Sequence, residues 1–184
     1  MRFGALHHTT QARHNGGVTS PRIVRAGLER IDHLRPLWES LSAHHAEVAP
    51  HLAALGGIRT PADSWAVRRA LYEEWLAEPD AFALIAEADS TPVGYALVHM
   101  RGPEETWLTG ERIAELETLT VLRAHRGKGI GGALVRAVYQ ELSRIGVGHL
   151  GVGVIASNPD AIRFYERLGL LPFLVTYIGP VPPN

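Results

Sequence analysis

Four glycines and two cations lie in one short segment, Arg126-Gly127-Lys128-Gly129-Ile130-Gly131-Gly132. Glycine permits positive φ angles and a close approach of the backbone to a ligand, because it has no Cβ. The segment opens an apolar helical pattern, and the first amide groups of a helix have no acceptor within it. Together with the helix dipole, these donors favour an anion, most often a phosphate. The segment therefore predicts a phosphate-binding turn.

The same glycines also satisfy the G-x-G-x-x-G fingerprint of dinucleotide-binding proteins. The preceding strand argues against that interpretation, because it carries Glu115 and Glu117, whereas a strand covered on both faces is nearly all apolar. The next apolar segment, residues 149–155, should end in an acid that binds a ribose, but the first acid after it is Asp160. A Walker A loop is excluded, since no Gly-Lys-Ser/Thr sequence occurs.

The turn lies between a strand pattern and a helix pattern. Residues 113–122 alternate with period two and are rich in β-branched side chains, which predicts a strand. Alternation places one set of side chains on one face of this strand: Glu115, Glu117, Leu119 and Val121. It places another set on the opposite face: Leu116, Thr118, Thr120 and Leu122. The helix after the turn has one apolar face: Ile130, Leu134, Val135, Val138, Leu142 and Ile145.

At these positions the chain resembles the GNAT superfamily of N-acetyltransferases. Arg126-x-x-Gly129-x-Gly131, after a strand that ends in Leu119-Thr120-Val121, is similar to the acetyl-CoA signature of that family. A second block, residues 158–169, is similar to its N-x-x-A-x-x-x-Y-x-x-x-G segment. The resemblance covers about residues 81–178. It implies acetyl-CoA as the co-substrate.

The resemblance also implies where the coenzyme binds. The pantetheine arm would form hydrogen bonds with the backbone of Leu119 and Val121, as an added strand would. The pyrophosphate would lie on the amides of residues 126–131, and Gly132 would let the helix approach closely. The resemblance implies coenzyme contacts at these positions: Leu119, Thr120, Val121, Arg126, Gly127, Lys128, Gly129, Ile130, Gly131, Gly132 and Asn158.

Three residues are candidates for the chemistry of acetyl transfer to a primary amine. Glu115 and Glu117 share a predicted strand face and are candidate bases, acting directly or through water; the alternative is a solvated strand face. Tyr165 occupies the position of the family's general acid near the coenzyme sulfur; the alternative is helix packing. The chain has no cysteine, which excludes a thiol acyl-enzyme and favours direct transfer in a ternary complex.

The fold class that the resemblance implies is α/β of the α+β type. It has a central, mostly antiparallel mixed sheet of six to seven strands, with helices on both faces. Strands four and five are parallel and splayed, and a β-bulge helps to open them. With 184 residues, the chain is expected to form one domain at 21–184 after a flexible tail at 1–20.

Local signals predict the remaining elements. A helix pattern runs from Ile31 to Val48, and a second helix follows Pro61, with Asp63 or Ser64 as its cap. Asn158 is expected to cap a helix at about 159–168 that Gly169 ends. Further strands are expected at these ranges: 22–26, 81–88, 93–100, 150–155 and 173–178. The aromatic residues of the second helix belong either to the core or to an acceptor wall: Trp65, Tyr72 and Trp75.

Composition limits the other classes of function. The net charge of −1 argues against a general nucleic-acid or membrane binder. No apolar run approaches the roughly 20 residues of a membrane span, and no export signal is seen, so a cytoplasmic location is expected. The ten histidines include the pairs His7-His8 and His44-His45, but none has the H-E-x-x-H zinc spacing, so no metal is expected.

Two other functions remain open from the sequence. One is a non-catalytic acyl-CoA sensor on the same fold, and the other is a dinucleotide-binding oxidoreductase. The acceptor is expected to be a small-molecule or peptide amine, but residues 28–78, which would form its wall, carry no signature. Many members of the family are homodimers, and the resemblance implies no more than that about assembly.

Overall fold

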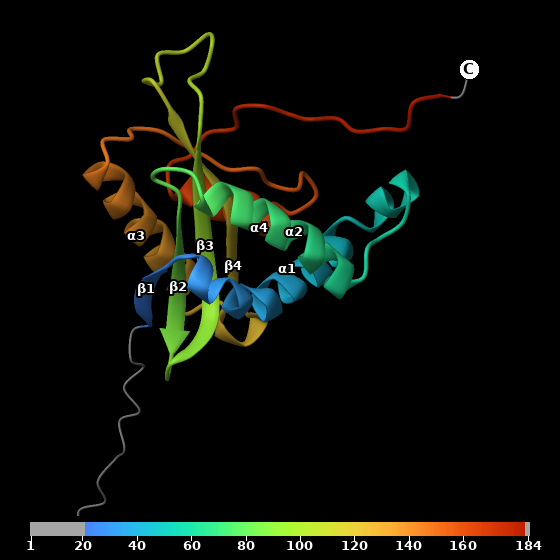
Figure 1. The fold of residues 1–184 in the computed structure, drawn as a ribbon. Coiled ribbons are helices and arrows are strands. Elements are labelled where there is room, and N and C mark those ends of the chain that lie inside the picture. Colours follow the sequence, from blue (N-terminus) through green and yellow to red (C-terminus); the bar gives the residue numbers. More distant parts are fainter. Residues whose placement is uncertain (1–20, 183–184) are drawn as a thin grey trace, which may run out of the picture.

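A computed structural model describes residues 21–182, so the predicted tail at 1–20, including His7 and His8, lies outside the described residues. The fold is built on a five-stranded sheet with the order β1-β2-β3-β4-β5 (Figure 1). Four of the strands pair antiparallel in chain order, whereas β4 and β5 are parallel. The strands are β1 (Arg22–Ala26), β2 (Phe82–Ala88), β3 (Thr91–Arg101), β4 (Ile113–Val121) and β5 (Leu150–Gly151).

Helices cover both faces of the sheet, as predicted (Figure 1). The α-helices are α1 (Arg35–Val48), α2 (Pro61–Leu76), α3 (Ile130–Arg144) and α4 (Pro159–Arg167). Three short 3₁₀ helices connect them: η1 (Leu28–Leu34), η2 (Pro50–Leu55) and η3 (Arg123–His125). No helix within residues 21–182 is long and apolar enough to cross a membrane.

Each face of the sheet has its own core. On one face, Leu134 and Val138 of α3 pack on the sheet, and α4 adds Phe164, Tyr165 and Leu168 at the edge. On the other face, the core is formed by residues of η1, α1 and α2 against β2 and β3: Ile31, Leu34, Leu37, Trp38, Trp65, Tyr72, Ile85, Tyr95 and Leu97. We call these the α3 face and the α2 face. The sheet therefore separates two sets of side chains that approach β4 from opposite sides.

The hairpin of β2 and β3 brings β3 close to β4. Asp89 and Ser90 both have positive φ angles, 48° and 64°, which form a two-residue turn. Thr91 and Pro92 therefore belong to β3, whereas the sequence placed them in the connection before the strand. A Cβ atom on Gly94 would lie 2.7 Å from the carbonyl oxygen of Thr120, so glycine is needed for this approach.

The first two helices differ in detail from the predicted ones. The apolar pattern from Ile31 begins as η1, and α1 starts only at Arg35, with Pro36 in its first turn, where a missing N–H costs nothing. The cap of α2 is Thr60, not Asp63 or Ser64: its hydroxyl accepts from the Asp63 N–H at 3.1 Å and donates to the Asp63 carboxylate at 2.7 Å.

Two predicted strand assignments are wrong at the β5 edge. Only Leu150 and Gly151 of the predicted strand 150–155 pair with β4, and residues 173–178 form no strand. Within residues 21–182 the sheet therefore has five strands and not six to seven. A two-residue β5 offers almost no backbone edge to a further strand, and the chain after α4 runs away from the body of the molecule (Figure 1).

The predicted start and end of α4 are confirmed. The Asn158 side chain accepts from the Ala161 N–H at 3.1 Å, and Pro159 follows as the first helical residue. Gly169 has φ 86°, and the Leu170 N–H donates to the Tyr165 carbonyl, which closes the helix. All predicted apolar positions of α3 are buried or pack against the core.

The contact at Gly94 yields the first testable prediction. Gly94→Ala should lower the free energy of unfolding by ~1–3 kcal/mol, because the added methyl group must push β3 away from β4. Gly148→Ala is the matched control, since a Cβ there meets nothing within 4 Å. Urea unfolding measures both. Equal stability of Gly94→Ala and wild type would contradict the close approach.

Candidate functional site

β4 contains one extra residue opposite β3. Leu97 pairs with Thr118, but the next residue, Val98, pairs with Leu116, so Glu117 is a bulge. A bulge reverses the alternation of side chains along a strand. The predicted alternation is therefore wrong beyond Glu117, although the predicted bulge in this region is confirmed.

The bulge decides which side chains of β4 share a face. Leu119 and Val121 pack on the α3 face, together with Ala114 and Leu116. The opposite face carries the polar residues of the strand: Glu115, Glu117, Thr118 and Thr120. The two glutamates lie on the same face, as the sequence suggested, but they share it with the threonines and not with Leu119 and Val121.

A buried group of hydroxyls lies beneath this polar face. The Tyr72 hydroxyl is 2.5 Å from the Thr118 hydroxyl and 2.8 Å from that of Tyr95. Burial raises the pKa of Tyr72 to about 12, and it raises the pKa of Tyr95 well above its ordinary value. Trp65 and Tyr72 are fully packed, which settles these two residues as core. The floor of the site is thus rigid and uncharged at neutral pH.

Glu117 lies in a cluster of three charged or titratable side chains. One carboxylate oxygen, Oε1, accepts from the Arg68 guanidinium of α2. The other oxygen, Oε2, is 3.7 Å from Nε2 of His99 on β3. Arg68 lies over the ring of Trp38 at 4.2 Å from its centre, and His99 stacks on Trp75 at 4.5 Å with an interplanar angle of 3°. Aromatic rings therefore hold both partners of Glu117.

Glu115 has a separate partner on β3. Its Oε2 accepts from Nε of Arg101 at 3.2 Å, and Arg101 also pairs with Glu104 at 2.6 Å. A Cβ on Gly151 would lie 2.7 Å from the same Oε2, so the carboxylate rests directly on the backbone of β5. Glu115 therefore lies at the last residue pair that joins β4 and β5.

β4 and β5 separate immediately after this contact. They pair only at Ala114–Leu150 and Glu115–Gly151. Further along β4, the Leu122 N–H donates to Val93 of β3, so the backbone groups of the preceding residue, Val121, face the opposite edge. The same alternation directs the backbone of Leu119 to that edge. The backbone of Leu119 and Val121 therefore faces the edge of β4 that β5 leaves unpaired, and there the Val121 carbonyl accepts from Arg126.

The glycine-rich turn follows at the end of this edge. Gly127 and Gly129 have φ angles of 73° and 79°, and Gly129 is the N-cap residue of α3. The first helical bond runs from the Ala133 N–H to the Gly129 carbonyl. The amides of Ile130, Gly131 and Gly132 therefore have no acceptor within the helix.

Two cations border the same turn, and their side chains fold onto its backbone. Nε of Arg126 donates to the Val121 carbonyl at 2.9 Å, and Nζ of Lys128 donates to the Ala124 carbonyl at 3.1 Å. The close approach that we expected at Gly132 is not seen, and at Gly131 a Cβ would make an ordinary van der Waals contact, 3.5 Å from the ring of Phe164. A Cβ on Gly132 would meet only Arg136 of the same helix.

Tyr165 lies on α4 at the margin of the α3-face core. Its ring meets Phe164 edge-on at 5.1 Å. Burial, and secondly Tyr139, raise its pKa well above the ordinary value, so the phenol keeps its proton at neutral pH. Within residues 21–182 its hydroxyl donates to no other side chain, yet it is not a buried unsatisfied atom, so it keeps accessible surface. It can therefore donate to a ligand.

Sequence reasoning missed Arg68, His99 and Arg101. Arg68 and Trp75 lie seven residues apart on one face of α2, and that helical spacing with Tyr72 between them was the available signal. His99 pairs directly with Glu115 in the β3–β4 register, but that register is fixed only by the bulge. The charged partners of both glutamates therefore depend on tertiary structure.

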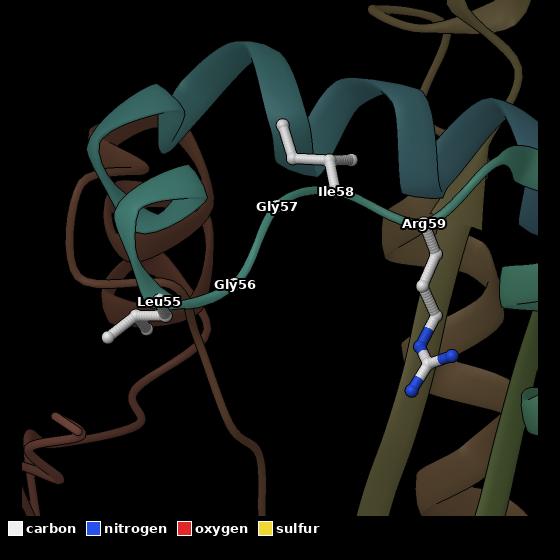
Figure 2. A pocket seen from close by; sticks show the side chains of 5 residues that line it. All are labelled: Leu55, Gly56, Gly57, Ile58 and Arg59. Carbon is white, nitrogen blue, oxygen red and sulfur yellow. The ribbon is translucent and has the colours of Figure 1, made fainter. Parts of the chain in front are cut away.

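One hollow of the described surface, of about 390 Å³, lies away from this site. It is lined by Leu55, Gly56, Gly57, Ile58 and Arg59 in the connection from η2 to α2. Figure 2 shows that its three large side chains, those of Leu55, Ile58 and Arg59, point in different directions and do not converge. Ligand sites bring a few polar groups together, so this hollow is a feature of the loop.

The described part of the chain also gives no support for a metal centre. Within residues 21–182, no three histidine, aspartate or glutamate side chains gather in a way that could hold an ion. The imidazole of His99 and the two glutamates are instead paired with each other or with guanidinium groups.

His45 provides a prediction for the α2 face. Burial against Trp38, then His44 and Arg68, lower its pKa from 6.5 to about 4. The unfolded chain therefore takes up a proton at a higher pH than the folded chain. The free energy of unfolding is therefore unaffected by His45 above pH 6.5. As the pH falls from 6.5 towards 4, it decreases by about 2–3 kcal/mol, because protonation of His45 favours the unfolded chain.

Unfolding in urea at pH 7.5 and at pH 4.5 measures this effect. His45→Gln should lose clearly less stability between these two pH values than wild type does. His51→Gln, which replaces an exposed histidine, should behave as wild type. The same acid sensitivity in His45→Gln and wild type would show that another group titrates.

Comparisons with known proteins agree with this geometry. The family described as the Acetyltransferase (GNAT) family matches residues 46–170. An uncharacterised N-acetyltransferase of Mycobacterium bovis is 32% identical over 100 residues, which are 54% of this chain and 59% of that protein. The mycothiol acetyltransferase of Brachybacterium faecium is 33% identical over 107 residues, 56% of this chain and 31% of that protein. The chain thus spans less than two thirds of these relatives.

Solved structures show the same fold. A Bacillus halodurans protein superposes with a TM-score of 0.70 at 17% identity, over 87% of this chain and 99% of that chain. An aminoglycoside N-acetyltransferase in complex with CoA superposes with a TM-score of 0.63 at 19% identity, over 88% of this chain and 94% of that chain. Because the family match spans more than half of the sequence, this chain belongs to the GNAT acetyltransferase family.

Proposed function

We propose that the protein transfers an acetyl group from acetyl-CoA to a primary amine. The observation that carries this proposal is the gap after Gly151, which leaves the edge of β4 open between two glutamates and a turn with three unpartnered amides. Along β4, the glutamates come first, then the unpaired edge and then the turn, which is the order that an extended phosphate-bearing thioester requires. Its reactive end would reach the glutamates while its phosphates reach the turn.

Several groups are suited to hold acetyl-CoA. The backbone of Leu119 and Val121 faces the open edge of β4, and an extended pantetheine arm can pair with it as a strand would. The amides of Ile130, Gly131 and Gly132 and the positive end of α3 favour the pyrophosphate. Arg126 and Lys128 would turn from the backbone carbonyls that they now contact towards the phosphates.

The proposed reaction follows from orientation and proton transfer. Acetyl-CoA supplies an activated thioester, and the amine nitrogen forms a bond to its carbonyl carbon while the carbon–sulfur bond breaks. Holding the two reactants side by side can supply ~7–11 kcal/mol of the barrier reduction. A glutamate of β4 removes the proton of the ammonium group, and the Tyr165 hydroxyl donates to the departing sulfur.

The acceptor we propose is a small-molecule or peptide amine. Two relatives named above, a mycothiol acetyltransferase and an aminoglycoside N-acetyltransferase, have names that point to different substrates, so they favour no single acceptor. The polar face of β4 and the aromatic residue Trp75 would form its wall.

The proposed function is tested by thiol release. Purified protein is mixed with acetyl-CoA and, separately, with polyamines, amino acids, aminoglycosides and peptides that have a free N-terminus, and free CoA is measured. Amine-dependent release supports the proposal. Binding of acetyl-CoA by calorimetry without release for any of these amines would favour a non-catalytic sensor instead.

Replacement of Gly129 tests the phosphate-binding turn. Gly129→Asp should raise the dissociation constant of CoA at least ~10-fold, because it places a negative side chain among the free amides. Gly146→Asp is the control, since Gly146 has a similar φ angle, 72°, at the other end of α3. Both variants carry the same backbone strain, so a loss of affinity in both, or in neither, would contradict the assignment. Calorimetry measures the affinity.

Replacement of Tyr165 tests the proton donor. Tyr165→Phe keeps the ring and its contact with Phe164 and removes the hydroxyl, so kcat should fall ~10²-fold while the affinity for CoA changes little. Tyr139→Phe, on the neighbouring and more exposed tyrosine of α3, should keep wild-type kcat. Normal turnover by Tyr165→Phe would show that this tyrosine only packs.

A further inference from the structure

The imidazole of His99 faces one of the two oxygens of the Glu117 carboxylate. Oε1 of Glu117 accepts from Arg68, whereas Oε2 lies 3.7 Å from Nε2 of His99. We propose that Glu117 and His99 form the proton path of the acetyl-transfer reaction, with Glu117 in contact with the amine and His99 receiving the proton from it. This inference rests on the proposed function and assigns its base.

The two glutamates are not equivalent as bases. Oε2 of Glu115 accepts from Arg101, and the same atom lies against the backbone of Gly151, so its surroundings hold it between two strands. No imidazole lies within ion-pair distance of Glu115 among the described residues. Glu117 projects from the bulge instead, and a bulge directs a side chain out of the regular ladder. Glu117 is therefore the carboxylate with an onward proton acceptor.

His99 is held in one orientation. Its ring stacks on Trp75 with an interplanar angle of 3°, and its side chain is only 14% exposed. The charged groups that face it are Glu115 and Glu117 from β4, Arg68 from α2 and Arg101 two residues along β3. Imidazole is the side chain whose ordinary titration lies nearest to neutral pH, which suits it to accept and release a proton in each turnover.

The proton balance follows from this arrangement. An ammonium acceptor gives its first proton to Glu117, which passes it to Nε2 of His99 once the two atoms, 3.7 Å apart in this structure, move within hydrogen-bond distance. The neutral nitrogen then forms the bond to the acetyl carbon. Tyr165 gives its proton to the sulfur as the carbon–sulfur bond breaks, and the second proton of the nitrogen replaces it on the Tyr165 oxygen, so the sulfur gains one proton overall. The remaining exposed surface of His99 lets the first proton return to solvent.

The dependence of kcat/KM on pH tests the proposal, with the amine that gives the fastest release of CoA. Glu117→Gln should lower kcat/KM ~10²–10⁴-fold, and by more than Glu115→Gln does. His99→Gln should lower kcat/KM at neutral pH at least ~10-fold and change the acidic limb of the profile, because the proton path then lacks its imidazole. His149→Gln, on an exposed histidine, is the control and should keep the wild-type profile.

Three outcomes decide between the possibilities. A wild-type acidic limb in a folded His99→Gln variant that binds CoA normally would remove His99 from the proton path. A large loss in Glu115→Gln with wild-type rates in Glu117→Gln would assign the base to Glu115 and overturn the proposal. A wild-type protein that binds CoA but releases no thiol with any amine would contradict the proposed function itself.

Discussion

The extra residue that β4 carries opposite Val98 governs the arrangement of the site, because a sheet side chain can change faces only where the ladder is interrupted. Without this bulge, Leu119 and Val121 would share a face with the glutamates, and the α3-face core would lose two of its apolar side chains. With it, the strand presents Leu119 and Val121 to α3 and four polar side chains to α2. The single extra residue, Glu117, thus places the apolar side chains in the core and the polar side chains in the site.

The polar face that results is charged but balanced. Glu117 pairs with Arg68, Glu115 pairs with Arg101, and all four side chains keep between a fifth and two fifths of their surface exposed. Pairs of this kind contribute little to stability, since desolvation offsets much of the attraction. What they do fix is geometry: Arg68 is also held on Trp38, so the pair sets the direction in which the Glu117 carboxylate points.

Local signals in the sequence were sufficient for the turn, α3 and α4, because glycine, asparagine and proline act within a few residues of their own positions. The bulge could not be read in this way, since it is a property of the register between β3 and β4. The ion pair of Arg68 with Glu117 joins residues 49 positions apart and needs the packing of α2 on the sheet. The expected strand at 173–178 failed because β5 ends after Gly151 and leaves it no edge to pair with.

The proposed donor and the proposed base reach β4 from opposite faces of the sheet. Tyr165 belongs to the α3-face core, whereas Glu117 and His99 lie on the α2 face with Trp75. A continuous ladder between β4 and β5 would separate Tyr165 from Glu117 and His99, because no molecule can pass between two strands that are joined by hydrogen bonds. The ladder ends after Gly151, one residue pair beyond Ala114–Leu150. The short pairing of β5 is therefore a requirement of the proposed chemistry, because a thioester that lies along the unpaired edge of β4 could contact a proton donor on one face and a base on the other.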